Sequence, residues 1–536
     1  MADQTRPLGA QISHMLKDRG VDVIFGIPGV HNQEMYRGIE EAGIAHVLAR
    51  HEQGAGFMAD GYARATGKPG VAYVITGPGV CNIMTPMGQA YSDSVPMLVI
   101  SSCLDETAAR RGQLHQMKDQ EIAAGTVCEW SETALSADAA YALIDRALVE
   151  FETKRPRSKH IQVPIAHLQA NAAETPFRAT GERNKPDFPL THPSFVSRIA
   201  EALKAAKRSI FVFGGGGKNI SSALTRSLLA RSGAASFVSY AGRGIVPSDQ
   251  TLFFGAALAR PESASIFEQA DLVVVVGSEL AEVDLWRDDL GQKCRTIRID
   301  IDPENLAGSP LAEFEGFLCD AVVTLDAVNE ALADHSANTL WSAEDVARHR
   351  ARWRAETDAE RPGIVPLCDA LRAVVPPETM VYSDMTQFAY VAKEVWDMDR
   401  PGHWHHPYGF GTLGYATPAA IGGAVARRGL PTMAIIGDYG FHYTMQELGV
   451  AVELGLSLPI ILWDNGKLKE IEDSMVRAQI APNAVIARNP DFVKLAEAFG
   501  AVAVAPATIA QMQEAVTEAF SAEGPTLIYL TPAVVA

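Results

Sequence analysis

Two polar side chains that could hold a metal ion follow neighbouring apolar segments in the last quarter of the chain. Asp438 comes after the apolar run MAII and Asn465 after LPIILW, with a helical stretch between them. Strand, helix and strand form a βαβ unit, and open α/β sheets bind their ligands at the carboxyl ends of such strands. A carboxylate and an amide oxygen suit a hard cation such as Mg²⁺ or Ca²⁺. A cation that is held by so few protein oxygens usually also binds a phosphate. The alternative is two ordinary polar loops.

Three strand-end turns near the N-terminus could form a second polar pocket. GIPGV delivers His31 to the start of a helix, Glu52 closes a short strand before a Gly/Ala-rich helix, and TGPG joins a strand to a helix. Backbone N–H groups at such a helix start attract anions. Three turns in one domain, one with a carboxylate, predict one pocket. For Glu52 alone, the alternative is a carboxylate that stabilises a helix N-terminus through the helix dipole.

The composition is that of a globular protein with several domains. With 536 residues the chain is too long for one core, and 47% of the residues are hydrophobic. The formal charge of −18 argues against general binding to nucleic acid or to an acidic membrane. No apolar run reaches the roughly 20 residues of a membrane span. The six cysteines form no CxxC pair, which favours reduced thiols and a cytoplasmic location.

Apolar strands alternate with amphipathic helices through three regions, so we predict an α/β fold with three doubly wound parallel-sheet domains. The expected domains span residues 1–175, 190–340 and 362–536. A polar linker is expected at 171–189 and a charged helical connector at 341–361. The expected strands lie at 23–25, 71–76, 97–101 and 161–163, on SIFVFGGGG, ASFVSY, DLVVVVG and TIRIDID, and at 380–383, 432–436, 459–463 and 526–530.

Four motifs in order along the chain are RHEQGAGFMADGYAR, ITGPG, GTLGYATPAAIG and GDYGF…DN. They resemble the thiamine-diphosphate enzymes of the acetolactate synthase and 2-oxo acid decarboxylase family, and the resemblance covers nearly the whole chain. It implies a pyrimidine-binding (PYR) domain, a central Rossmann-like domain and a diphosphate-binding (PP) domain. It also implies thiamine diphosphate and Mg²⁺ as cofactors, and a homodimer or homotetramer with each site between two subunits. FAD is unlikely, because the middle region has no sharp nucleotide motif.

The resemblance also implies roles for individual residues. Glu52 matches the glutamate that hydrogen-bonds the pyrimidine ring, and Leu413 matches the apolar residue that bends the cofactor. Asp438 and Asn465 match the metal ligands, with the backbone oxygen of Lys467 as the third. Further cofactor contacts are expected from Thr76, Gly77, Asn82, Thr386, Gln387, Gly411, Tyr439, Gly440 and Leu468.

Two residues depart from the family's usual pattern. Tyr439 stands where the family usually has glycine, and a tyrosine there would cost energy if the backbone needed a positive φ. Asp464 stands where the family usually has asparagine, which adds a negative charge beside the expected metal and diphosphate. Both changes bear on the affinity for the cofactor.

Several stretches, among them GVDVIFGIPGVHNQEMYRGI and LWDNGKLKEI, resemble the 5-guanidino-2-oxopentanoate (2-ketoarginine) decarboxylases. The implied activity is decarboxylation of a polar 2-oxo acid through a C2 ylid and an enamine. The resemblance implies that His115 and Gln116 lie over the thiazolium ring and that His31 is an active-site histidine. A histidine there could carry protons; a histidine bonded in a turn is the alternative. Glu470 could bind a cationic substrate tail, unless it belongs to a solvated acidic face.

Two other functions stay open at this point. The first is a carboligase of the acetolactate synthase or glyoxylate carboligase type, which shares every step up to the enamine. The second is a protein that keeps the cofactor fold with weak or no catalysis. Glu52, Leu413, Asp438 and Asn465 together argue against the second.

Overall fold

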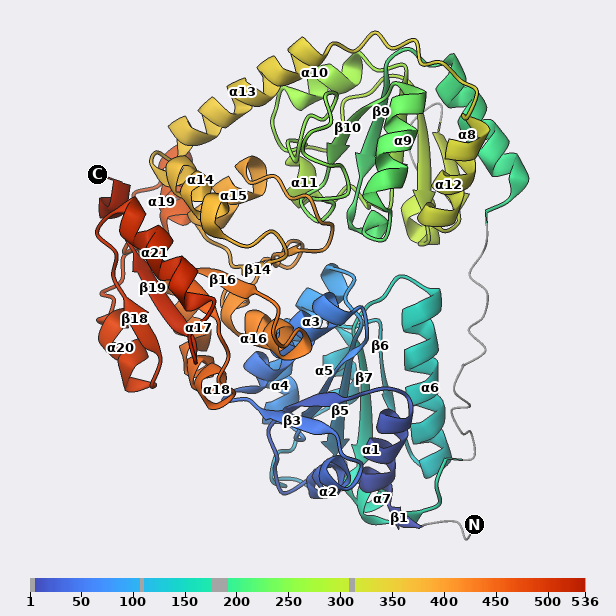
Figure 1. Ribbon diagram of the computed structural model, residues 1–536. Helices are drawn as coiled ribbons and strands as arrows, with labels where there is room; N and C mark the ends of the chain where they lie inside the picture. The colour runs from blue at the N-terminus through green and yellow to red at the C-terminus, as the bar shows by residue number, and fades with distance from the viewer. Residues whose placement is uncertain (1–4, 107–109, 176–190, 308–313, 536) are drawn as a thin grey trace.

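The computed structural model describes residues 5–106, 110–175, 191–307 and 314–535, which fold around three parallel sheets with helices on both faces (Figure 1). The predicted fold class is confirmed. The connector between the second and third sheets is the helix α13 (Ala343–Glu360). The expected linker at 171–189 falls mostly outside the described residues.

The first sheet belongs to the N-terminal domain. Its elements are β1 (Arg6–Pro7), α1 (Leu8–Asp18), β2 (Val23–Gly26), α2 (Gln33–Glu41), β3 (Ala45–Leu48), α3 (Glu52–Thr66), β4 (Gly70–Val74), α4 (Pro78–Ser92), β5 (Met97–Cys103), α5 (Gln120–Gly125), β6 (Trp130–Thr133), α6 (Ala137–Thr153), β7 (Lys159–Pro164), α7 (Ile165–Gln169) and β8 (Asn171–Ala172). The strand order is β3-β2-β4-β5-β7-β6. The short strands β1 and β8 pair separately and antiparallel.

The third sheet repeats this topology. Its elements are α14 (Ile364–Val374), β14 (Met380–Ser383), α15 (Gln387–Val395), β15 (Trp404–His405), α16 (Ala416–Ala426), β16 (Thr432–Gly437), α17 (Asp438–Thr444), η3 (Met445–Glu447), α18 (Leu448–Glu453), β17 (Pro459–Trp463), α19 (Lys469–Arg477), α20 (Phe492–Ala498), β18 (Val502–Val504), α21 (Ile509–Ala519), β19 (Thr526–Leu530) and η4 (Pro532–Val535). The order β15-β14-β16-β17-β19-β18 matches that of the first sheet strand for strand. Helices α3 and α16 hold equivalent places in the chain order. Each follows the second strand of its sheet and precedes the third: α3 connects β3 to β4, and α16 connects β15 to β16.

The central sheet has five strands in the order β10-β9-β11-β12-β13. Its elements are α8 (Pro193–Ala205), β9 (Ser209–Phe213), η1 (Gly215–Gly217), α9 (Ser222–Ser232), β10 (Ala235–Val238), α10 (Ser263–Glu268), β11 (Leu272–Val276), α11 (Glu282–Leu285), β12 (Arg295–Asp300), η2 (Pro303–Leu306), β13 (Phe314–Leu318) and α12 (Ala321–Ala331). Helices α8, α9 and α12 cover one face, and α10 and α13 cover the other.

One hydrophobic core joins the first and third sheets. It runs from Phe25 and Val74 on the first sheet, through Phe57 on α3 and Ala420 on α16, to Ile460 on the third sheet. Helices α3 and α16 are therefore packed between the two sheets, where Figure 1 shows them side by side. The opposite faces of these sheets have cores of their own. Because the two domains share a core, their relative placement is fixed by buried apolar contact.

Glycines allow α3 and α16 to approach closely. A Cβ atom on Gly61 would lie 1.9 Å from the carbonyl oxygen of Ala419, and one on Gly422 would lie 1.9 Å from that of Met58. Tyr382 Oη donates to the carbonyl oxygen of Gly61 at 2.8 Å. The reciprocal contacts explain the Gly/Ala-rich sequence of both helices.

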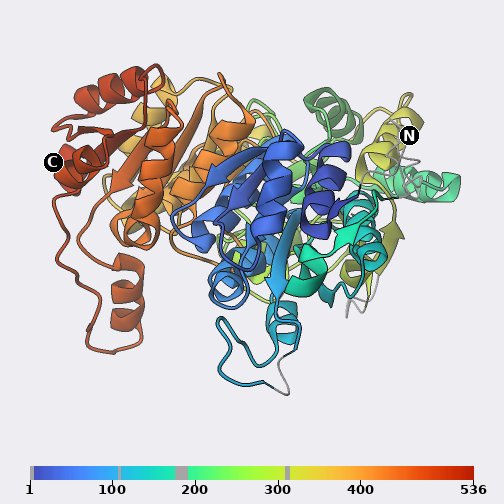
Figure 2. The same ribbon diagram turned by 90° about the horizontal axis from the view of Figure 1, so that it is seen from below.

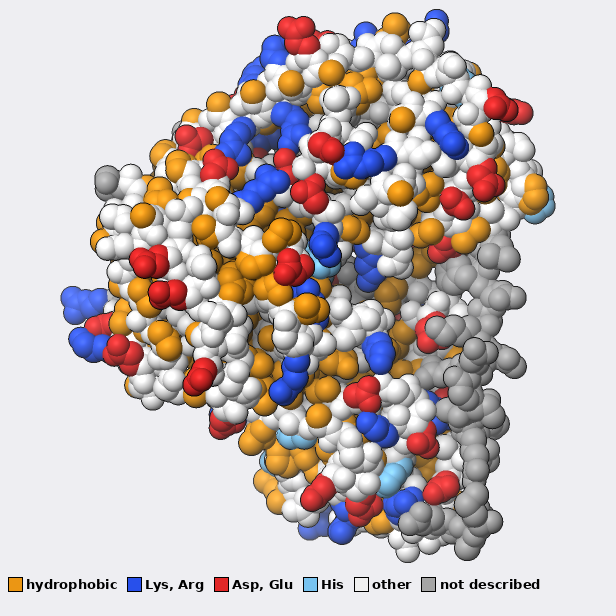
Figure 3. Space-filling view, in the orientation of Figure 1, with side chains coloured by type: hydrophobic (Ala, Val, Ile, Leu, Met, Phe, Trp, Pro, Cys, Tyr) orange, Lys and Arg blue, Asp and Glu red, His pale blue; other side chains and the backbone are white. Residues whose placement is uncertain are grey.

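Among the described residues, no helix has the length and apolar character to cross a membrane. On the face that Figure 3 shows, basic and acidic side chains are interspersed, so the excess negative charge does not form one continuous area there.

We predict that Gly61→Ala lowers stability, because the added methyl group collides with backbone that cannot turn aside. Overpacking of this kind costs about 1–3 kcal/mol. Gly524→Ala is the control, since a Cβ atom there meets nothing within 4 Å. Denaturant midpoints should fall for Gly61→Ala and not for Gly524→Ala. Equal midpoints for both variants would contradict the close-packing interpretation.

Candidate active site

Glu52 stands among the strand-end turns that were expected to form an N-terminal pocket. It is the first residue of α3, whereas the preceding strand β3 already ends at Leu48, so the expectation that Glu52 closes the strand is wrong. The side chain is 9% exposed, and its Oε2 accepts a hydrogen bond of 2.9 Å from Asn82 Nδ2 on α4. Gly79, in the turn that starts α4, approaches the other carboxylate oxygen. The start of α3 and the start of α4 therefore face each other.

A loop over residues 113–120 closes against the turn at 76–79. Gly77 has a φ of 72°, and a Cβ atom on it would lie 2.4 Å from the carbonyl oxygen of His115. Gln120 Oε1 accepts from Gly77 N at 2.8 Å, and Thr76 Oγ1 lies 2.7 Å from Ser102 Oγ. Only glycine fits at position 77, because both the backbone angle and the approach of the loop exclude a side chain.

His31 and His115 meet at this pocket. Their ring centroids lie 5.0 Å apart in an edge-to-face arrangement. Nδ1 of each ring is buried, with no hydrogen-bond partner among the described residues. Burial, and then the neighbouring His115, lower the pKa of His31 although Asp105 opposes this, which favours the neutral ring. Gln116, by contrast, bonds within its own loop, through Gln113 N and Arg110 O.

The expected metal ligands lie at adjacent strand ends of the third sheet. Asp438 begins α17 directly after β16, and Asn465 and Lys467 follow the neighbouring strand β17. Asp438 is 3% exposed. Tyr439 lies inside α17 and is not among the described residues with positive φ, so the cost foreseen for a tyrosine does not arise.

Asp464 is hydrogen-bonded next to Asp438. Asn489 Nδ2 donates to Asp438 Oδ2 at 2.8 Å and to Asp464 Oδ1 at 2.9 Å. Asp464 Oδ1 also accepts from Gly466 N, and its Oδ2 accepts from Tyr529 Oη, both at 2.8 Å. Burial first, and also the charge of Asp464, raise the pKa of Asp438. The sequence analysis missed Asn489 and Tyr529, since neither belongs to a motif.

A polar chain leads away from Asn465. Its Nδ2 donates to Gln387 Oε1 at 3.4 Å, and Gln387 Nε2 donates to Glu470 Oε1 at 2.9 Å. Arg361, just beyond α13, holds both oxygens of Glu470 at 2.8 and 3.2 Å. Burial raises the pKa of Glu470, but the bonds and charge of Arg361 outweigh it and lower the pKa overall. Glu470 therefore has a cationic partner within its own chain.

Asp384, which the sequence analysis also missed, organises the loop that carries Leu413. Its carboxylate accepts from the backbone N–H of Met385 at 2.8 Å, Gly414 at 3.2 Å and Ala416 at 3.0 Å. Burial raises the pKa of Asp384 to about 6.

Glycines complete the same loop and bring it to the metal-ligand end of the sheet. Gly411 and Gly414 have φ of 66° and 83°, which leaves the half-buried Leu413 at the tip of a tight turn. Gly440 packs against Asp384, and Gly437 packs against Thr386. These residues therefore gather with Asp438 and Asn465 at one edge of the third sheet.

The site residues thus form two groups, one around Glu52 and one around Asp438. No contact found in the described part of the chain joins the two groups directly. Two connections between the domains lie near the groups: the Glu447 carboxylate accepts from Arg50 N at 3.1 Å just before α3, and Thr412 Oγ1 donates to Gln89 Oε1 on α4 at 3.1 Å. Burial raises the pKa of Glu447 to about 7.

The oxygen atoms expected to bind a cation near Asp438 can supply only part of the coordination shell of a small hard cation. In the described ranges, no cluster of three or more His, Cys, Asp or Glu side chains is arranged to bind a metal. One carboxylate, one amide oxygen and one backbone oxygen form an incomplete shell of hard donors. Mg²⁺ commonly accepts such a shell when substrate phosphates and water supply the remaining oxygens. The donor set therefore fits Mg²⁺ together with a diphosphate.

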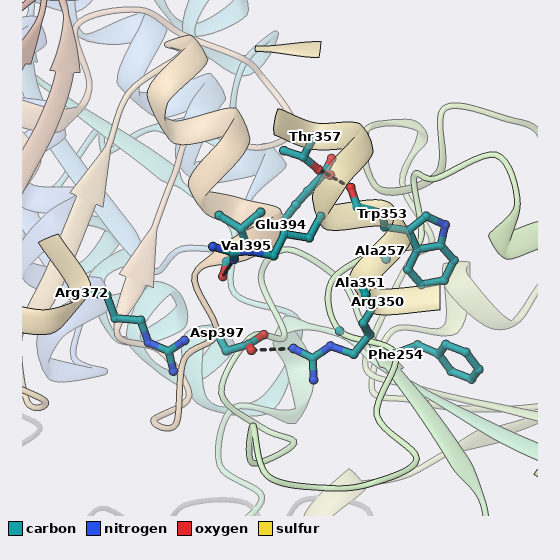
Figure 4. Close-up of a pocket in the computed structure, with 12 residues that line it drawn as sticks. Phe254, Ala257, Arg350, Ala351, Trp353, Thr357, Arg372, Glu394, Val395 and Asp397 are labelled. Carbon is teal, nitrogen blue, oxygen red and sulfur yellow. Dashed lines mark hydrogen bonds and ion pairs between the residues drawn. The ribbon is translucent and has the colours of Figure 1, made fainter. Parts of the chain in front are cut away.

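A separate cavity of about 200 Å³ lies where α13, α15 and the central domain meet (Figure 4). Arg350 crosses it to Asp397 at 2.5 Å, and Thr357 donates to Glu394 at 3.0 Å. None of the residues predicted for the active site lines it.

Comparison with known proteins agrees with the geometry. Three family models of thiamine pyrophosphate enzymes match: the N-terminal TPP binding domain over residues 6–122, the central domain over 196–328 and the C-terminal TPP binding domain over 384–530. The chain is 40% identical to a probable 2-ketoarginine decarboxylase of Pseudomonas aeruginosa, over 98% of this chain and 94% of that protein. It is 29% identical to the acetolactate synthase large subunit of Haemophilus influenzae, over 94% and 91% of the two chains.

A solved structure shares the fold along the whole length. It is the thiamine diphosphate-dependent 4-hydroxybenzoylformate decarboxylase of Rhodococcus jostii RHA1, with a TM-score of 0.84 at 20% identity over 98% of this chain and 99% of that one. A buried glutamate at the start of α3, two polar strand ends on the third sheet and three matching domains point the same way, and the chain belongs to the thiamine pyrophosphate enzymes.

Proposed function

We propose that this enzyme is a thiamine diphosphate- and Mg²⁺-dependent decarboxylase of a polar 2-oxo acid, with 5-guanidino-2-oxopentanoate as the first candidate. The observation that carries the chemistry is the buried carboxylate of Glu52, bonded to Asn82 and facing the start of α4. The candidate substrate comes from the relative at 40% identity, which is named a probable 2-ketoarginine decarboxylase.

Thiamine diphosphate, when bound, supplies a carbanion that adds to a carbonyl and then accepts the electron pair released with CO₂. Asp438, Asn465 and the backbone oxygen of Lys467 would hold the metal and the diphosphate end. Glu52 would hold a proton at the pyrimidine ring, and Leu413, at the tip of its turn, would fix the bend between the two rings. Thr76, Gly77, Asn82, Thr386, Gln387, Gly411, Tyr439, Gly440 and Leu468 are proposed to line the cofactor.

His31 and His115 are the proposed proton carriers. Their side chains meet edge to face, and the lowered pKa of His31 favours a neutral ring that can accept a proton. Gln116 would act only if the local bonds of its loop opened. The proposed role of His115 requires the 113–120 loop to stay closed over Gly77.

Two chains would be needed to complete each site, as a homodimer or homotetramer. Two observations support this assembly: the Glu52 and Asp438 groups have no direct contact within the described chain, and large apolar side chains are exposed beside both. Figure 2 shows the segment with α19 standing out from the molecule. Exposed apolar residues near the two groups are Val30, Leu114, Tyr443, Ile471, Val476, Ile480 and Ile486. The six cysteines include no CxxC pair, which supports a cytoplasmic location as part of this proposal.

Carboligation is the second candidate, favoured by the 29% identity to an acetolactate synthase subunit. It differs from decarboxylation only after CO₂ has left, when a second carbonyl compound takes the place of a proton. The product therefore separates the two functions.

The direct test is a screen of 2-oxo acids that includes 5-guanidino-2-oxopentanoate, with added thiamine diphosphate and Mg²⁺. We expect CO₂ and the aldehyde that is one carbon shorter, in equal amounts. Glu52→Gln should reduce turnover at least about 100-fold, because general acid–base groups contribute about 10²–10⁴-fold. A hydroxyketone as the main product would favour the carboligase, and the absence of CO₂ from every acid would reject both.

Glu470 is proposed to bind the cationic tail of the substrate. Because Arg361 already pairs with its carboxylate, a cationic tail would share this carboxylate, and the expected discrimination is modest. We expect Glu470→Gln to lower the kcat/KM ratio of cationic over neutral 2-oxo acids by about 10-fold, the lower range for bonds to a charged group. Asp473→Asn on the same helix, which pairs with Lys469, is the control. An unchanged ratio in Glu470→Gln would reject this role.

A further inference from the structure

Asn489 lies at the junction of the two carboxylates near the proposed cation site. It sits in the segment between α19 and α20, outside every motif of the family resemblance. Its Nδ2 reaches Asp438 Oδ2 at 2.8 Å and Asp464 Oδ1 at 2.9 Å, while its Oδ1 faces His442 Nε2 at 3.1 Å. An ionised carboxylate only accepts hydrogen bonds, so the amide NH₂ must point at the two aspartates. Its oxygen then requires a proton on Nε2 of His442.

Each amide hydrogen is thus used on a different carboxylate. For Asp438 this bond occupies Oδ2, while the Tyr439 N–H and the Asp464 carboxyl group are also in hydrogen-bond contact with the Asp438 carboxyl group. For Asp464 the result is different, because Gly466 N and Tyr529 Oη also donate to it. Three donors hold Asp464 in place, so its charge is compensated by hydrogen bonds of the protein.

We propose that Asn489 is a positioning residue that presents Asp438 to the metal through one oxygen and holds Asp464 outside the coordination shell. The inference rests on the proposed function, since it concerns the cation that would bind there. It also explains how the chain accommodates aspartate at position 464. The extra carboxylate shapes the loop that carries Asn465 and Lys467, through its bond to Gly466 N.

The test is calorimetric titration of the full-length protein with Mg²⁺ in the presence of thiamine diphosphate. Residues that orient metal ligands typically contribute 10–100-fold to metal affinity. We expect Asn489→Leu to weaken Mg²⁺ binding by about that factor, and to lower the melting temperature of the metal-free protein because two buried carboxylates each lose a donor. Asn483→Leu is the matched control on the same segment, because Asn483 is exposed and bonds only to Ala481 O in the described structure.

Each result has a defined meaning. Equal Mg²⁺ affinity of Asn489→Leu and the wild type would overturn the positioning role and leave the proposed function intact. No Mg²⁺ binding by the wild type would overturn both. If Asn489→Leu fails to fold, Asn489→Ser, whose shorter side chain lacks the amide and cannot bridge both carboxylates, decides by the same criterion.

Discussion

The close contact between α3 and α16 determines where the other functional parts lie. Both helices are buried in one core between two sheets of equal topology, and Gly61 and Gly422 let their backbones touch. Each helix begins at functional residues: Glu52 starts α3, and the turn with Leu413 leads into α16. Packing these helices together therefore fixes the two TPP binding domains relative to each other, without bringing the proposed site residues at the helix ends into contact within the described chain.

Charges buried beside this contact reinforce it. Asp60 on α3 pairs with Arg64 at 2.6 Å and accepts from Tyr415 Oη at 2.8 Å, and Arg64 also reaches Asp93 at 2.8 Å. Burial raises the pKa of Asp60, although Arg64 opposes this. Removing one partner of such a buried pair is costly, because the other charge is left uncompensated.

The sequence predicted the central strands well and missed four of the six edge strands of the three main sheets. Runs such as 459–463 and 272–276 are continuously apolar because both faces are covered, and they form β17 and β11. The missed strands β6, β13, β15 and β18 lie at sheet edges, where exposure or short length removes that pattern. Val502 on β18, for example, is 51% exposed. Apolar continuity reports burial on both faces over several residues, which β6, β13, β15 and β18 do not have.

The site shows the same division between local and distant determinants. Glu52, Asp438 and Asn465 could be proposed from the sequence because each begins or follows an element within a recognisable motif. Asn489 and Asp384 act through partners that only the fold brings near, and a single polar residue in a loop has no periodic signal. The energetic cost expected for a tyrosine at position 439 does not arise, because this position is helical and requires no positive φ.

Subunit complementation tests most directly whether two chains share each active site. Glu52→Gln and Asp438→Ala should each be inactive alone. In a mixed dimer, one site would combine the intact Glu52 of one chain with the intact Asp438 of the other. Unfolding and refolding an equal mixture should restore roughly a quarter of the wild-type activity, because half of the dimers are mixed and one of their two sites is intact. No recovery from a properly refolded mixture would contradict a site shared between chains.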